Sequence, residues 1–182
     1  MKVFMVFGGR LAHDEKGKVV LGEDTRTACQ IAVDLCKHEG STSLIVATAG
    51  IPKDKKWGKI WMGYSMVDYM KSICASLTYR HQNATRFNTF AEAKALAKVM
   101  PCLFSWHNIS PTDEVVIIAK RWHAQRAKMD CVFWFSRAGL EIPIRCETFE
   151  SPASVWTRII REQLATINDR RKMLSDRYLD TD

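Results

Sequence analysis

The sequence lacks the features that would assign it to a membrane-spanning or a metal-binding class. No stretch approaches the roughly 20 apolar residues that span a bilayer, and the N-terminus has neither the basic region nor the long apolar region of a signal peptide. The six cysteines show no C-x-x-C spacing, which argues against a zinc site and suits a reducing compartment. We therefore expect a cytoplasmic protein without membrane insertion and without a bound metal.

The remaining composition is that of an ordinary globular domain. The chain has 182 residues, of which 47% are apolar and 26% charged, so one continuous core over 1–182 is the default. The net charge of +7 favours an acidic partner, either nucleic acid or a small anion drawn into a cleft. The distribution of charge along the chain decides between these two.

Short apolar runs alternate with helical stripes over the whole length. The runs predict buried strands at 2–7, 44–47 and 115–119, with weaker strands at 79–82 and 142–146. Apolar residues at helical spacing predict helices over 28–36, 66–77, 93–100, 121–136 and 156–167, although 131–135 could instead be a strand. This alternation predicts an α/β fold with a mostly parallel sheet of about five strands and helices on both faces.

The polar residues of interest follow a strand or open the next helix. In a parallel sheet these positions share one rim, beyond the carboxyl ends of the strands, where ligands bind. Their shared location is the main argument for a binding site. The candidate residues are Gly8, Gly9, Arg10, Arg26, Asn88, Thr89, Glu92, His123 and Arg126.

The first predicted strand ends in Gly8 and Gly9, which would let backbone N–H groups approach an anion closely. No G-x-G-x-x-G or Walker pattern accompanies them, so a plain turn is an equal explanation. Arg10 and Arg26 could form a fork for phosphate or carboxylate, because a guanidinium presents paired donors in one plane. Each alone is also typical of a surface arginine.

Asn88, Thr89 and Glu92 open a predicted helix. Thr89 with Glu92 three residues on is a capping box, which satisfies N–H groups at a helix start. Asn88 and Glu92 are also one helical turn apart, so both can face a cleft where the helix dipole favours anions. Capping and binding can coexist in this segment.

His123 and Arg126 carry the strongest functional signal. They directly follow the clearest strand, and their spacing of three places them on one helix face. His123 could act as a general acid or base near neutral pH, or donate to an anionic ligand. Glu92 is the second candidate catalytic residue. A purely structural histidine is the alternative.

Three weaker patterns have simpler explanations. The HDE segment at 13–15 cannot turn three adjacent side chains toward one ion without a tight bend. Cys102 and His107 would make a thiol and its base, but prolines frame them in a connection away from the strand ends. The lysines and tryptophans of 53–61 suit single-stranded nucleic acid, yet one such loop is usually a lid or a solvated surface.

Five segments follow one another in a recognisable order: VFGGR, TRTA, LIVATAG, NATRFNTFAEA and VVIIAKRWHAQRA. Together they resemble the uncharacterised SanA, ElyC and YdcF family over most of the chain. The resemblance implies a Rossmann-like three-layer fold and a single SanA/ElyC/YdcF-like domain. It also implies functional roles for Gly8, Gly9, Arg26, Asn88, Thr89, His123 and Arg126.

The chain departs from this family at three places. The second glycine-rich turn is reduced to Ala49-Gly50, no acidic residue stands at Ala84, and the segment 120–122 replaces smaller residues. Members have been linked to envelope or peptidoglycan metabolism, and several carry membrane anchors. The departures imply that this chain's ligand could differ from theirs.

The leading hypothesis is an enzyme or binding protein for a phosphate-bearing or nucleotide-like small molecule, acting as a hydrolase or transferase. Arginines would hold the anion, with His123 beside the reacting group. A nucleotide-like ligand such as S-adenosylmethionine is one candidate cofactor. The alternatives are a ligand sensor without chemistry, and nucleic-acid binding through the 53–59 loop and the arginine-rich C-terminal segment.

Overall fold

The structure, a computed structural model, describes residues 2–9, 11–39, 43–50, 62–84, 88–108, 113–151 and 156–175, without the side chains of 157 and 158. Its centre is a five-stranded sheet in the order β5-β4-β1-β6-β7. The strands are β1 (Lys2–Phe7), β4 (Leu44–Gly50), β5 (Thr78–Ala84), β6 (Glu114–Lys120) and β7 (Ile144–Phe149).

All four strand pairings of this sheet are parallel, and the order along the chain reverses at β1. The chain builds outward from β1 to β4 and β5, then returns to place β6 on the other side of β1. This order is that of Rossmann-like sheets, in which the crevice at the reversal is the usual ligand site. The predicted α/β class with a parallel sheet is therefore confirmed.

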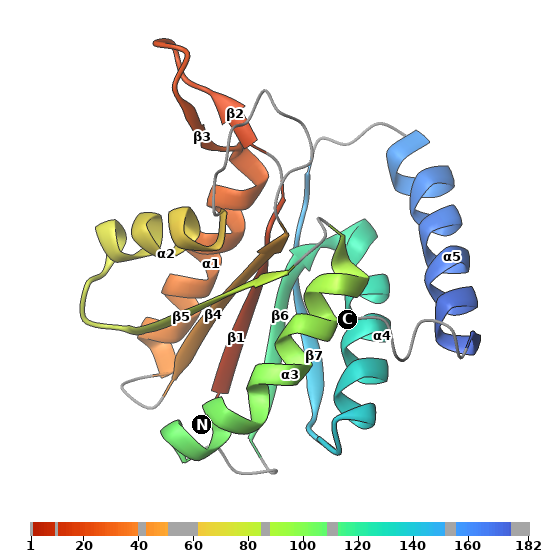
Figure 1. The fold of residues 1–182 in the computed structure, drawn as a ribbon. Helices are drawn as coiled ribbons and strands as arrows, with labels where there is room; N and C mark the ends of the chain where they lie inside the picture. Colours follow the sequence, from red (N-terminus) through yellow and green to blue (C-terminus); the bar gives the residue numbers. More distant parts are fainter. Residues whose placement is uncertain are drawn as a thin grey trace.

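Helices cover both faces of the sheet and make three layers (Figure 1). On one face lie α1 (Glu23–Glu39) and α2 (Met62–Ile73), and on the other α3 (Thr89–His107) and α4 (Arg121–Arg137). The last elements are the π-helix η2 (Trp156–Arg161) and α5 (Glu162–Leu174), which pack against α4. α5 therefore lies outside the three layers, at the edge of the molecule (Figure 1).

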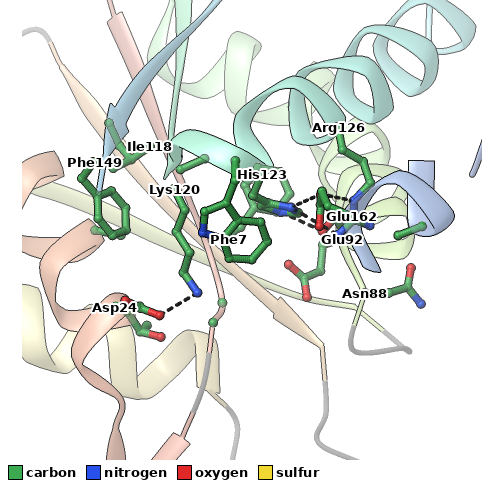
Figure 2. A pocket seen from close by; sticks show the side chains of 18 of the residues that line it. Phe7, Asp24, Asn88, Glu92, Ile118, Lys120, His123, Arg126, Phe149 and Glu162 are labelled. Carbon is green, nitrogen blue, oxygen red and sulfur yellow. Dashed lines mark hydrogen bonds and ion pairs between the residues drawn. The ribbon is translucent and has the colours of Figure 1, made fainter. Parts of the chain in front are cut away.

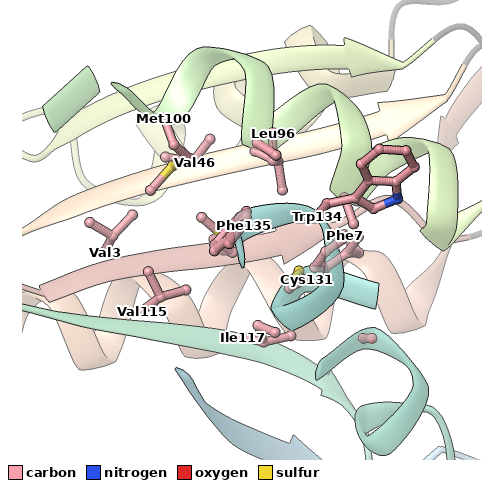
Figure 3. Close-up of a cluster of buried hydrophobic side chains, with 14 of the residues drawn as sticks. Val3, Phe7, Val46, Leu96, Met100, Val115, Ile117, Cys131, Trp134 and Phe135 are labelled. Carbon is pink, nitrogen blue, oxygen red and sulfur yellow. The ribbon is translucent and has the colours of Figure 1, made fainter. Parts of the chain in front are cut away.

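The core divides into two apolar clusters, one on each side of the sheet, because the central strands are buried on both faces. Figure 3 shows the cluster beneath α3 and α4, where Ile117 of β6 lies close to Cys131 and Phe135 of α4. Leu96 and Met100 of α3 close the same cluster and are fully buried. The apolar runs of the sequence are thus the strands that lie between two helical layers.

Several predicted elements differ in detail from the structure. The segment after β1 forms an antiparallel hairpin of β2 (Leu11–His13) and β3 (Val19–Leu21), which was not predicted. The last strand lies a few residues later than 142–146, and residues 131–135 are helical. α3 continues through Pro101 to His107, so the predicted connection there is wrong. A proline inside a helix removes one hydrogen bond but need not end it.

The C-terminal helix has its apolar stripe on the opposite side from the usual one. An apolar stripe normally faces the core, but six large apolar side chains of η2 and α5 are exposed, while Glu162 and Asp169 are buried. Met173 of α5 is partly buried against the core. Within the described part of the chain, no helix is both long and apolar enough to cross a membrane.

We predict that Leu96→Ala lowers the free energy of unfolding by about 2–5 kcal/mol, because it leaves a cavity among side chains that cannot collapse onto it. Leu164→Ala is the matched control, since the Leu164 side chain is exposed, and it should change stability by less than about 0.5 kcal/mol. Urea denaturation measures both. Similar losses for the two variants would contradict the position assigned to Leu96 in the core.

Candidate functional site

A cavity of about 360 Å³ opens beyond the carboxyl ends of β1 and β6, where the strand order reverses (Figure 2). Its size suits a small-molecule ligand. The cavity brings together seven of the nine predicted site residues: Gly8, Gly9, Asn88, Thr89, Glu92, His123 and Arg126. Its wall also includes Phe7, Asp24, Thr25, Ala28, Ile118, Ala119, Lys120, Trp122, Phe149, Arg161, Glu162 and Ala165.

The turn after β1 is too closely packed to accept side chains. A Cβ at Gly8 would lie 2.5 Å from the Cβ of Ala49, and a Cβ at Gly9 would lie 2.6 Å from Oγ1 of Thr25. The Gly8 N–H donates to the carbonyl of Thr48 at 2.6 Å. Close approach between backbone segments therefore accounts for both glycines, and the Gly8 N–H is engaged within the sheet.

The start of α3 is capped by Asn88, whose side-chain oxygen accepts from the Ala91 N–H at 2.9 Å. The expected capping box of Thr89 and Glu92 is therefore wrong, because the cap lies one residue earlier. Thr89 becomes the first helical residue, and its buried side chain lines the cavity. The positive end of the α3 dipole thus points at the cavity.

Glu92 is buried and lines the cavity wall one helical turn after Asn88. Its Oε1 accepts the N–H of Gly50, at the end of β4, at 3.1 Å. Burial raises the pKa of Glu92 to about 8, although the Gly50 hydrogen bond and the charge of Arg126 oppose the shift. Glu92 is therefore mostly protonated at neutral pH and can donate a hydrogen bond.

His123, in the first turn of α4, is held on both ring nitrogens. Its Nδ1 lies 2.7 Å from Oε1 of Glu162, and its Nε2 lies 3.1 Å from Oγ1 of Thr89. The contacting atoms thus form a chain from a hydroxyl through an imidazole to a carboxylate, and Figure 2 shows the His123 and Glu162 side chains facing each other. This is the order of groups found in hydrolases that activate a hydroxyl nucleophile.

The surroundings of His123 select one tautomer. The carboxylate of Glu162 only accepts, so Nδ1 carries the hydrogen and Nε2 is left to accept from the Thr89 hydroxyl. Arg126 Nη2 lies 3.2 Å from Nδ1, but a guanidinium cannot donate to a nitrogen that already bears hydrogen. Burial lowers the pKa of His123, and the charges of Arg126 and Lys120 lower it further against the effect of Glu162. The ring is therefore neutral at pH 7 and able to take a proton.

Arg126 lines the cavity with its charge already compensated. Its Nε donates to Glu162 Oε1 at 2.6 Å, and its Nη1 donates to Asp169 Oδ2 at 3.1 Å. Burial alone would raise the pKa of Glu162, but the hydrogen bonds and charges of His123 and Arg126 outweigh it and lower that pKa. Arg126 therefore fixes α5 to α4, and an anionic ligand would have to compete with two carboxylates for it.

The other end of the cavity is lined by a second ion pair and by apolar side chains. Lys120, at the end of β6, lies 2.7 Å from the carboxylate of Asp24 in the first turn of α1. Its ammonium also lies 5.2 Å from the centre of the Trp122 ring. Phe149 and Ile118 complete this end, away from His123 (Figure 2). The cavity thus has one end with acid-base groups and one mostly apolar end.

Of the two predicted arginines, the structure describes only Arg26. Arg26 is exposed on α1 and is not among the lining residues, although its neighbour Thr25 is. Arg10 lies outside the described residues, as does the lysine-rich segment 53–59. The predicted arginine fork therefore has no counterpart among the residues that the structure describes.

The weaker patterns lie away from the cavity. The Asp14 carboxylate accepts the backbone N–H groups of Lys16 and Lys18 at 3.0 and 2.8 Å, which closes the turn of the β2–β3 hairpin. Cys102 is exposed on α3, about 20 Å along the helix axis from Thr89 by the 1.5 Å rise per residue. Neither pattern contributes to the chemistry of the site.

Two residues of the site, Glu162 and Asp24, were not predicted from the sequence. Glu162 lies far along the chain from His123, and only the folded structure brings the two together. The one hint is that Glu162 and Asp169 are the acidic residues of a segment otherwise rich in apolar and basic side chains. Asp24 was missed because an acid in a first helical turn is ordinary.

Comparisons with known proteins add no identification. No family model, no curated protein and no solved structure matches the chain. The fold and the site together define an α/β protein with a cavity at the strand-order reversal. Its function must be argued from the residues themselves.

We predict that Glu92→Gln reduces the loss of stability between pH 5 and pH 8. The unfolded carboxyl releases its proton near 4.5 and the folded one near 8, so the folded state binds more protons over this interval. The stabilisation is complete below the unfolded pKa and is lost as pH rises through the folded pKa. At about 1.4 kcal/mol per pKa unit, the wild type should lose a few kcal/mol more than the variant.

Urea denaturation at several pH values measures this difference, and Asp130→Asn is a useful comparison. Asp130 on α4 is fully buried, and its carboxylate has no hydrogen-bond partner among the described groups. Burial and the nearby charge of Asp169 raise its pKa to about 8, so it contributes in the same direction. Parallel stability curves for wild type and Glu92→Gln would show that the Glu92 pKa is ordinary.

Proposed function

We propose that this protein is a hydrolase or transferase acting on a phosphate-bearing or nucleotide-like small molecule bound in the cavity. The observation that carries the proposal is the contact chain Thr89, His123 and Glu162 on the cavity wall. The ring contacts a hydroxyl on one side and a carboxylate on the other, which is the order of groups in hydrolases that activate a hydroxyl nucleophile. The SanA, ElyC and YdcF resemblance implies roles for Thr89 and His123 and is part of the proposal.

In the proposed reaction, Nε2 of His123 takes the proton of the Thr89 hydroxyl, or of a water held by it, as the oxygen attacks the electrophilic centre of the substrate. The bond from that centre to the leaving group then breaks, and the imidazolium of His123 gives its proton to the leaving group. Glu162 keeps the ring in the required tautomer and stabilises the imidazolium that forms. A neutral histidine is the form needed at the start, and its lowered pKa favours that form.

Negative charge developing on the substrate would be met by the start of α3. The first N–H groups of a helix have no acceptors within the helix, and the dipole adds a partial positive charge. The protonated carboxyl of Glu92 supplies a further donor on the same wall. Arg161, exposed at the cavity rim, adds a cation for a substrate phosphate.

A thermal-shift screen would identify the ligand class. Nucleotides, sugar nucleotides, S-adenosylmethionine and phosphorylated sugars are the compounds to test. A ligand at about 100 times its Kd stabilises by roughly 2.7 kcal/mol, which raises Tm by several degrees at about 2–4 °C per kcal/mol. No shift with any compound at millimolar concentration would argue against the phosphate-bearing class.

We predict that His123→Gln lowers turnover of the identified substrate by about 10²–10⁴ while much of the ligand affinity remains. Thr89→Val, which keeps the shape and removes the hydroxyl, should behave similarly, and Thr89→Ser should retain activity. Glu150→Gln is the control, since Glu150 is an exposed carboxylate paired with Arg121. Steady-state kinetics and binding are measured on each variant.

The outcomes separate an enzyme from a sensor. Ligand binding without turnover in the wild type would make the protein a ligand sensor. Full activity in His123→Gln would remove the catalytic role of the histidine. Full activity in Thr89→Val alone would leave water as the nucleophile, with His123 still acting as its base.

A further inference from the structure

The C-terminal elements η2 and α5 present an apolar surface to solvent. We call this surface the α5 face. Its side chains are between 42% and 86% exposed, and they account for six of the nine exposed large apolar residues found in the described part of the chain. Its members are Trp156, Ile159, Ile160, Leu164, Ile167 and Leu174. A concentration of this kind on one helix marks an interaction site.

The orientation of the α5 face is fixed by buried polar contacts. Glu162 is bound by His123 and Arg126, and Asp169 is bound by Arg126 and by Lys172 at 2.8 Å. Turning the apolar side chains inward would expose both carboxylates and leave the buried Arg126 without partners. Removing one member of a buried ion pair is strongly destabilising, so the α5 face stays directed outward.

The charges beside the α5 face indicate what it binds. The exposed charged side chains of η2 and α5 in the described residues are Arg161, Arg170 and Arg171, all positive, while both acids are buried. Pairing this face with a second copy would bring arginines from both chains together with no carboxylate from either face. Unpaired like charges at an interface are unfavourable.

A nucleic acid would satisfy the arginines but not the aliphatic side chains. Nucleic acids engage cations through phosphates and aromatic rings through base stacking, and isoleucine and leucine offer neither. An anionic lipid surface meets both needs, because its acyl region takes apolar side chains and its headgroups take arginines.

We propose that the α5 face binds the surface of an anionic lipid bilayer, with η2 and α5 lying in the plane of the interface. Arg170 and Arg171 adjoin the apolar side chains on α5 and would reach the headgroups, as long basic side chains do at such interfaces. Trp156, at the start of η2, suits the boundary between headgroups and acyl chains. α5 stands at the outer edge of the fold, so a flat surface can approach it (Figure 1).

Flotation of the full chain with vesicles tests the proposal. Vesicles of pure phosphatidylcholine are compared with vesicles in which about a third of that lipid is replaced by phosphatidylglycerol. We expect binding to the anionic vesicles that weakens at least tenfold in Ile160→Glu/Ile167→Glu and, at low salt, in Arg170→Gln/Arg171→Gln. Val132→Glu is the matched control, because Val132 is an exposed apolar residue on α4 and its variant should bind like the wild type.

Each alternative result overturns the proposal. Absence of binding to anionic vesicles by the folded wild type would do so directly. Binding that survives both α5 double variants would assign it to another surface. A concentration-dependent dimer in sedimentation velocity that Ile160→Glu/Ile167→Glu abolishes, without vesicle binding, would make the α5 face an interface between two copies. The substituted side chains are exposed, so the variants should fold like the wild type. Circular dichroism of each variant checks this.

Discussion

The carboxylate of Glu162 is the interaction on which the arrangement of the site depends. One oxygen of this group lies within hydrogen-bonding distance of both His123 and Arg126. It sets the tautomer of the histidine, compensates the charge of the arginine and holds α5 against α4. Buried charges are costly unless they are paired and hydrogen-bonded, so these three residues form one unit.

The two acids with raised pKa values differ in what surrounds them. Glu92 accepts the Gly50 N–H and faces a cavity, whereas Asp130 is enclosed and its oxygens meet no donor among the described groups. Ionisation of either acid lowers the free energy of unfolding at neutral and alkaline pH. Groups whose ionisation is disfavoured in this way concentrate at functional sites, and of the two only Glu92 borders space that a ligand could enter.

The sequence predicted the fold well because its strongest signals are local. Residues 3–7 and 115–119 are apolar without interruption, as central parallel strands are, and both stretches are strands. The β2–β3 hairpin escaped prediction because three-residue strands carry almost no periodicity. The proximity of Thr89 and His123 could be predicted, because ligands bind beyond the carboxyl ends of parallel strands and both residues lie there.

Contacts between residues that lie far apart along the chain could not be predicted from the sequence. Nothing local distinguishes Glu162 from a surface glutamate, and its role appears only when α5 packs beside α4. The same contact explains why an apolar stripe points to solvent, since the buried ion pairs decide which side of the helix faces inward. Arg26 illustrates the converse, because a residue beside a cavity-lining threonine points away from the cavity.

The position of Glu162 along the chain bears on how the protein is made. During synthesis the sheet strands and the helix that carries His123 leave the ribosome before α5 does. Until α5 arrives, Arg126 has no carboxylate from that helix and the cavity lacks one side of its wall. A domain generally folds as a unit during synthesis. The acid-base groups of the site therefore come together only after α5 has left the ribosome and packed beside α4.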